Sequence, residues 1–187
     1  VGSRSQPTLV LLHGIGSASG SWSGVFEGMV ATHRVVAWDA PGYGGSAPLT
    51  QPSPVADDYA QALETLLLGL QAGPITVVGH SLGALTAAAL AARGHITVQA
   101  LVLASPAQGY GRASAEVREA KYNDRVNTVA RLGIEGMAAA RSSALCAAGA
   151  SSDVIATVQE NMRLVTVGGY RQAAYLLSHG DIRQHLA

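Results

Sequence analysis

One short segment, residues 79–83, has the residue types and the spacing of a serine nucleophile site. It is Gly-His-Ser-Leu-Gly, it follows an apolar run at residues 75–78, and an alanine-rich stretch begins directly after it. Such a strand, turn and helix lift a serine hydroxyl above the edge of a sheet, and the flanking glycines remove side chains that would clash in the turn. The N–H groups at the start of the helix favour developing negative charge. We therefore predict that Ser81 is a catalytic nucleophile.

A second glycine-rich segment supplies a candidate for binding that negative charge. Residues 13–16 are His-Gly-Ile-Gly and follow the first apolar run of the chain. The tetrahedral intermediate of acyl transfer needs two N–H donors aimed at its oxyanion. We expect one donor to be the backbone N–H of Leu82, directly after the serine. We assign the other to Ile15, with Gly16 as the next choice, and interpret His13 as a structural residue that orients the loop.

Alternating strands and helices are expected to position these residues. Four short apolar runs bounded by turn residues are typical of buried parallel strands, at residues 8–12, 34–38, 75–78 and 100–104. Helical patterns lie between them, at residues 22–31, 55–70 and 82–93. The third helix stops at Gly94, which suits a helix C-terminus. This order predicts an α/β fold with a parallel sheet covered on both faces.

The pattern changes after Pro106. We find no further strand there and expect helices at residues 114–132, 134–147, 152–165, 168–178 and 181–186. Glycines separate these stretches, including Gly133 and Gly149. We therefore divide the chain into an α/β core at residues 1–108 and a helical cap, or lid, at residues 109–187.

Three motifs in a fixed order carry a family resemblance. They are H-G-x-G at residues 13–16, D-x-P-G-x-G-x-S at residues 39–46 and G-H-S-x-G at residues 79–83. In this order they resemble the α/β-hydrolase fold superfamily, in its serine esterase, lactonase and C–C-hydrolase branch with a helical cap. Residues 129–137 loosely resemble the caps of 3-oxoadipate enol-lactonases. The resemblance implies an α/β-hydrolase fold, of which this chain would be a partial domain. It also implies that Asp39 belongs to a structural turn and is not the triad acid.

A serine nucleophile needs a histidine to take its proton and a carboxylate to orient that histidine. By resemblance, the acid follows the strand after the cap and the histidine follows the last strand, and neither strand is visible here. Some relatives carry the acid after the strand before the cap, but here that strand runs into Ser105 and Pro106. We therefore expect both residues in a C-terminal remainder of the same hydrolase, whose strands are physically present beside this chain.

The histidines that follow Ser81 in the sequence give no strong candidate for the base that takes the serine proton. His95 lies in a turn at the wrong end of the sheet, while His179 and His185 lie on helical segments. The side chain of His80 should point away from the neighbouring serine. We expect His80 to line the substrate pocket together with Gly14 and Gly16.

The composition gives no support for nucleic-acid binding or for binding to an anionic membrane. Lys+Arg and Asp+Glu balance at 12 each, which gives no electrostatic reason to expect nucleic acid or an anionic membrane as partner. Charged residues are only 13% and hydrophobic residues 48%, which suits a sizeable core. The single cysteine, Cys146, cannot form an internal disulfide, which fits a reducing compartment, and we expect a cytoplasmic protein.

The predicted reaction is hydrolysis of a small carboxylic ester or lactone through an acyl-enzyme on Ser81, which needs no metal or organic cofactor. The alternatives are a C–C-bond hydrolase or an acyltransferase of the same fold, or a non-catalytic module that binds a ligand. Apolar cap residues favour an apolar pocket. The cap arginines either anchor a substrate carboxylate or lie on a solvated face; they are Arg125, Arg131, Arg141 and Arg163.

Overall fold

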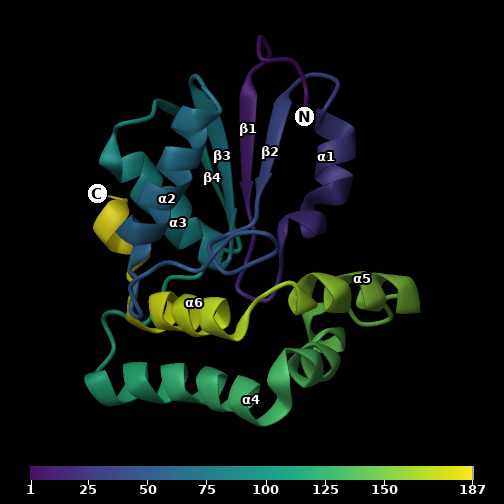
Figure 1. Ribbon diagram of the computed structural model, residues 1–187, viewed down its shortest axis with the longest axis vertical. Helices are drawn as coiled ribbons and strands as arrows, with labels where there is room; N and C mark the ends of the chain where they lie inside the picture. The colour runs from purple at the N-terminus through teal and green to yellow at the C-terminus, as the bar shows by residue number, and fades with distance from the viewer. Residues whose placement is uncertain (187) are drawn as a thin grey trace.

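A four-stranded parallel sheet forms one half of the molecule (Figure 1). The computed structural model describes residues 1–186. The strands are β1 (Thr8–Leu12), β2 (Arg34–Trp38), β3 (Ile75–His80) and β4 (Val98–Ala104), in the order β2-β1-β3-β4. Leu12 lies opposite both Trp38 and Gly79, and His80 lies opposite Ala104. The carboxyl ends of the strands therefore meet at one edge, and the predicted α/β sheet is confirmed.

Helices cover both faces of this sheet, as βαβ connections require (Figure 1). Helix α1 (Ser23–Met29) lies on one face, while α2 (Ala56–Gly69) and α3 (Leu82–Arg93) lie on the other. Successive side chains of β1 point to opposite faces. Leu9 and Leu11 accordingly pack with the α1 side, whereas Val10 and Leu12 join the core under α2 and α3.

Most predicted element boundaries are reproduced, and the deviations are local. β1, β2 and α3 have the predicted limits, and Gly94 closes α3 with a left-handed φ of 68°. β3 extends two residues further, to His80, and β4 begins two residues earlier, at Val98. The helix expected at residues 22–31 is shorter: a 3₁₀ turn, η1 (Ser19–Trp22), precedes α1, and α1 ends at Met29.

The second half is helical and lies against the carboxyl ends of the strands (Figure 1). It contains α4 (Ala115–Arg141), η2 (Ser143–Leu145), α5 (Ser152–Arg163) and α6 (Val167–His179). Gly133 bends α4 with φ 66° and ψ 178°, so the break expected at this glycine is present inside a longer helix. After α6 the chain returns to the core, where η3 (Ile182–His185) packs against α3.

Two glycines allow α6 to pack directly against the loop that follows β2. Gly42, in the loop after β2, has φ 87°, and a Cβ placed on it would overlap the Cα of Gly169 in α6. A Cβ placed on Gly169 would lie 2.6 Å from the Cα of Gly42. Beside the crossing, Thr166 N–H donates to the Gly42 carbonyl and Gly44 N–H donates to the Leu164 carbonyl, each at 2.8 Å. The loop at residues 39–46 is therefore a close contact point between the sheet-containing half and the helical half.

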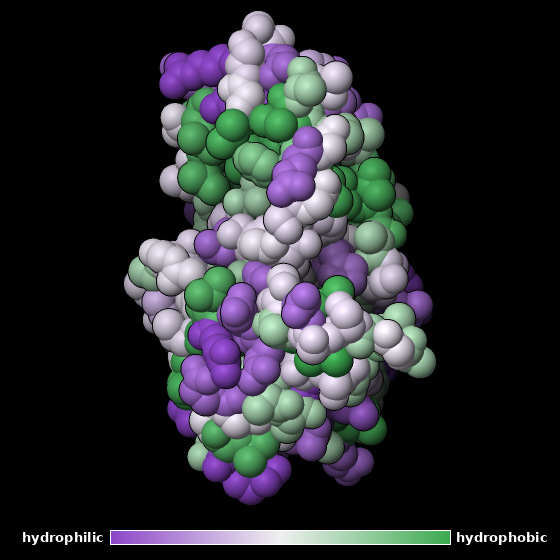
Figure 2. Space-filling view, turned by 90° about the vertical axis from the view of Figure 1, so that its right-hand side faces the viewer, coloured by the Kyte–Doolittle hydropathy of each residue, from purple (hydrophilic) through white to green (hydrophobic). Residues whose placement is uncertain are grey.

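The two outer strands of the sheet differ in how their free edges are covered within residues 1–186. On β2, Val35 exchanges two hydrogen bonds with Val1, at 2.9 and 3.0 Å. β4 pairs only with β3 in this part of the chain, and Val102 on it is 46% exposed. A hollow of about 540 Å³ runs beside β2, with Phe26, Val35 and Leu70 among its lining residues. Figure 2 views the side on which α1 and α5 lie, and shows hydrophobic surface over the sheet-containing half. No helix within the described residues is long and apolar enough to cross a membrane.

Candidate active site

Ser81 occupies a strained turn between β3 and α3. Its φ of 51° and ψ of −115° lie outside the regions that residues with a side chain ordinarily adopt. A Cβ on Gly79 would lie 2.6 Å from the carbonyl oxygen of Gly83, and a Cβ on Gly83 would lie 2.6 Å from that of Leu12. Both flanking positions are thus restricted to glycine by backbone contacts, as the sequence pattern predicts.

Two backbone hydrogen bonds hold this turn in place. Ser81 N–H donates to the carbonyl of Ala104 at the end of β4, at 3.1 Å. The Ser81 carbonyl accepts from Ala107 N–H, also at 3.1 Å. The strained conformation is therefore fixed by neighbouring elements, which is the condition under which such strain persists.

The glycine-rich loop after β1 lies against the serine side chain. A Cβ placed on Gly14 would lie 3.2 Å from the Cβ of Ser81 and 3.6 Å from its Oγ. Within residues 1–186, the backbone N–H groups of Ile15 and Leu82 donate no hydrogen bond, so both remain available to a ligand. Ile15 also lines the pocket that contains Ser81, whereas the Leu82 side chain is buried at the start of α3.

His13 and Tyr43 hold that loop from behind. His13 Nδ1 donates to the Gly14 carbonyl at 2.8 Å, and its Nε2 accepts from Ala40 N–H at 3.1 Å. Burial lowers the pKa of the His13 imidazole, which keeps the ring neutral in this structural role. The Tyr43 hydroxyl donates to the Ile15 carbonyl at 2.7 Å. Sequence reasoning missed Tyr43, although it stands inside the D-x-P-G-x-G-x-S motif.

Asp39 lies in the turn that carries Tyr43 and does not reach the serine. Its carboxylate accepts from Ser19 N–H at 2.8 Å, and its carbonyl accepts from the Ser46 hydroxyl at 2.7 Å. It is not among the residues that line the pocket. These contacts agree with the structural role inferred from the family resemblance.

A pocket of about 630 Å³ opens over Ser81, between the sheet-containing half and the helical half. The predicted pocket residues Gly14, Gly16 and His80 line it. The remaining lining is mostly apolar; from the helical half it comprises Arg141, Leu145, Val158, Met162 and Tyr170, and from the sheet-containing half Ile15, Ser17, Ser21, Trp22, Ala104 and Ser105. The site therefore combines a serine in a strained turn, backbone N–H groups without a partner among the described residues, and a largely apolar pocket.

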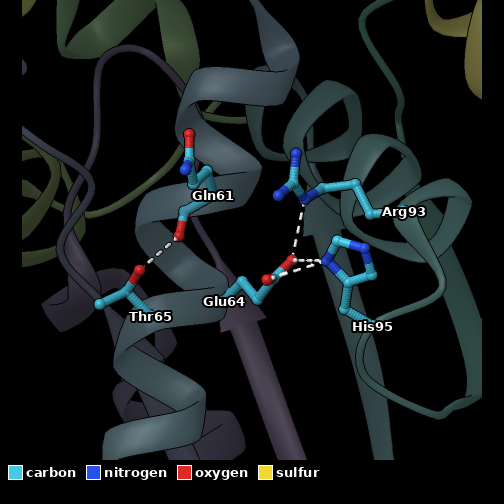
Figure 3. Close-up of polar contacts among 5 residues, drawn as sticks. All are labelled: Gln61, Glu64, Thr65, Arg93 and His95. Atoms are coloured by element: carbon cyan, nitrogen blue, oxygen red, sulfur yellow. Dashed lines mark hydrogen bonds and ion pairs between the residues drawn. The ribbon is translucent and has the colours of Figure 1, made fainter.

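No carboxylate and no histidine except His80 is among the residues of 1–186 that line this pocket. His95 lies at the amino end of β4, where its Nδ1 is 3.1 Å from the carboxylate of Glu64, which also pairs with Arg93 at 2.8 Å (Figure 3). The same close-up shows Thr65 bonded to the carbonyl of Gln61 within α2. His179 stacks on Tyr175 with ring centroids 4.0 Å apart. Neither of these histidines lines the pocket that contains Ser81.

Comparison with known proteins agrees with this geometry. A family model described as the alpha/beta hydrolase fold matches residues 7–142, which span both glycine motifs and reach the end of α4. The chain belongs to the α/β-hydrolase fold family. The family predicted from the three motifs is thus confirmed.

The relatives of this α/β-hydrolase chain include several hydrolases. It is 37% identical over 102 residues to a putative carbamate hydrolase, RutD, of Klebsiella pneumoniae; the match covers 52% of this chain and 36% of that protein. Matches to curated relatives span 23% to 36% of those proteins' lengths.

Solved structures show the same fold along the whole chain. A carboxylesterase structure from Nitrososphaera gargenis superposes with a TM-score of 0.83 at 22% identity, over 100% of this chain and 70% of that one. An enol-lactonase from Burkholderia xenovorans superposes with a TM-score of 0.81 at 23% identity, over 98% and 70%. At these identities the likeness concerns the fold.

Proposed function

We propose that this protein is a serine hydrolase that cleaves a small carboxylic ester or lactone through an acyl-enzyme on Ser81. One observation carries the proposal: Ser81 sits in a strained left-handed turn, against a glycine-rich loop and at the wall of a largely apolar pocket. Strain of this kind concentrates where a side chain must be presented to a ligand. The hydrolase relatives and the esterase and lactonase folds among the structural neighbours support the same chemistry.

In the proposed mechanism, Ser81 Oγ attacks the substrate carbonyl while a base takes its proton. The N–H groups of Ile15 and Leu82 stabilise the resulting oxyanion. The intermediate collapses, the alcohol leaves with a proton, and an ester forms on Ser81. Water then attacks that ester and releases the acid, which restores the serine. Residues 109–187 act as a cap that sets the size of the acyl group, over a core at residues 1–108.

We further propose that the acid and the histidine come from a C-terminal remainder that pairs with the open edge of β4. Two observations support this. The pocket lining within residues 1–186 contains neither a carboxylate nor a suitably placed second histidine, and β4 has a free outer edge with Val102 exposed. An unpaired strand edge is a template for another strand.

Labelling with a fluorophosphonate probe tests the nucleophile. In the full-length protein we expect the probe to modify Ser81, because only a hydroxyl activated by a base reacts rapidly. Ser81→Ala should remove the labelling without changing the melting temperature by more than a degree or so, since the substitution deletes one partly exposed oxygen. Modification at a different residue, or none in a folded sample, would exclude the proposal and favour the non-catalytic binding module.

The base and the reaction type are tested on the same protein. A chloromethyl ketone analogue of a cleaved ester should alkylate a histidine C-terminal to residue 186, whereas alkylation of His80 would contradict the proposed remainder. Release of 4-nitrophenol from short 4-nitrophenyl esters, measured with and without added alcohols, separates hydrolysis from acyl transfer. Lactone opening and C–C cleavage are scored in parallel.

A further inference from the structure

One pocket residue is out of keeping with the rest of the lining. Arg141, in the last turn of α4, faces the same cavity as Ser81, and no carboxylate lines that cavity within residues 1–186. Its guanidinium forms no ion pair or hydrogen bond with a described residue. A basic residue near a helix C-terminus is favoured by the helix dipole. That effect explains the charge on the last turn, but not its presentation to an apolar pocket.

The other three cap arginines are explained without a ligand. The guanidinium of Arg125 donates to the Lys121 carbonyl at 2.8 Å, within α4. Arg163 pairs with Glu135 at 2.6 Å. Arg131 and Arg141 are both solvent-exposed, but only Arg141 lines the pocket. Of the four arginines considered from the sequence, Arg141 is thus the one that combines a place in the pocket with an unpaired guanidinium.

Tyr170 adds a second polar group to the same wall. It is 3% exposed and lines the pocket, and its hydroxyl has no hydrogen-bond partner within residues 1–186. Burial raises the pKa of this hydroxyl, so it remains a donor at neutral pH, while the nearby positive charge of Arg141 acts against the rise. A guanidinium and a phenol then offer donors and no negative charge. That combination suits a carboxylate, which accepts two parallel bonds from arginine.

We propose that Arg141, with Tyr170, binds a free carboxylate on the substrate, so that the ester or lactone cleaved at Ser81 is an acidic one. This inference rests on the proposed function of Ser81. The substrate class becomes a monoester of a dicarboxylic acid, or a lactone that bears a carboxylate. The apolar residues between the two ends, Leu145, Val158 and Met162, contact the carbon chain that separates the ester from the acid group.

Binding is measured first, on the full-length Ser81→Ala protein, so that turnover does not interfere. The ligands are monomethyl and dimethyl esters of dicarboxylic acids of different chain lengths from glutaric to suberic acid, which differ within a pair only in the charged end. We expect the monoester of the best length to bind roughly tenfold to a hundredfold more tightly than its diester. Arg141→Gln should abolish that preference, and Arg131→Gln, a matched change on the same helix, should leave it intact.

Turnover is then measured with Ser81 intact. The substrates are 4-nitrophenyl hydrogen adipate and methyl 4-nitrophenyl adipate, with their shorter and longer homologues. Arg141→Gln should lower kcat/KM for the acidic ester roughly tenfold to a hundredfold more than for the neutral ester. Arg131→Gln, outside the pocket on the same helix, should leave kcat/KM for both esters unchanged. Tyr170→Phe should lower the same preference by a smaller factor, and Arg141→Lys should restore part of it.

The outcomes separate the inference from the proposed function. Equal binding of monoester and diester at every length, or a preference that survives Arg141→Gln, overturns the carboxylate site even if both esters are hydrolysed. Absence of 4-nitrophenol release and of fluorophosphonate labelling overturns the hydrolase, while the binding series still decides whether Arg141 recognises a carboxylate.

Discussion

At the scale of single residues, burial sets the protonation states that the site needs. Burial lowers the pKa of His13 and raises that of Tyr43, so the imidazole stays neutral and the phenol keeps its proton. A neutral His13 can donate through Nδ1 and accept through Nε2 at the same time. The two residues thereby fix the Gly14 and Ile15 carbonyls, and with them the direction of the neighbouring N–H groups.

Tyr43→Phe tests this positioning role. The change leaves the Ile15 carbonyl without its partner, which should lower the free energy of unfolding by about 1–2 kcal/mol. If the Ile15 N–H is the proposed oxyanion donor, it would lose its fixed orientation, and kcat/KM should fall about ten- to a hundredfold. Tyr59→Phe is the matched control, since the Tyr59 hydroxyl is buried without a hydrogen-bond partner in the described chain. Equal effects of the two substitutions on activity would remove Tyr43 from the oxyanion loop.

At the scale of elements, sequence patterns predicted what depends on local order. The apolar runs and turn residues predicted the limits of β1, β2 and α3. The two glycines around Ser81 predicted its tight turn. The contact of α6 with the loop after β2 was not predicted, because Gly42 meets Gly169 only through tertiary packing. The contact of Gln172, whose side chain hydrogen-bonds both backbone groups of Leu49, was not predicted for the same reason. Arg141 was named only as one of four equivalent arginines, since a helix pattern does not tell which one faces a cavity.

Gly169→Ala tests the crossing of α6 over the core. Its added methyl would lie 2.6 Å from the Gly42 backbone, which cannot move aside cheaply, and overpacking of this kind costs about 1–3 kcal/mol. Gly168→Ala, one residue away, meets nothing within 4 Å and should stabilise the helix by up to about 1 kcal/mol. Urea unfolding of both variants provides the comparison. A Gly169→Ala protein as stable as Gly168→Ala would show that the cap does not depend on this contact.

At the scale of the whole molecule, the two ends of the sheet carry different features. The carboxyl end carries Ser81 and the pocket, whereas the amino end carries the Glu64 cluster between α2 and α3 (Figure 3). The hydrogen bond from Arg93, and then that from His95, holds the pKa of Glu64 below its ordinary value of 4.5. This carboxylate therefore favours the folded state above its ordinary pKa, and the contribution disappears as the pH falls through the lowered value.

Glu64→Gln should accordingly lower the melting temperature at about pH 7, and the difference from the parent protein should shrink toward about pH 3. Ester hydrolysis should not change, because the cluster is remote from the pocket. Glu27→Gln, an exposed change on α1, is the control and should have little effect at either pH. A loss of stability that stays constant across this range would mean that Glu64 acts through packing and not through its charge.

The crossing of Gly42 and Gly169 also bears on how such proteins diversify. The backbones of Gly42 and Gly169 touch without a side chain between them. Neither residue can be replaced by a larger one unless the backbone of the other moves. A helical segment from another protein could replace this one only if it had a glycine at the position of Gly169. This backbone contact therefore limits which substrate specificities could be acquired by replacing the helical segment.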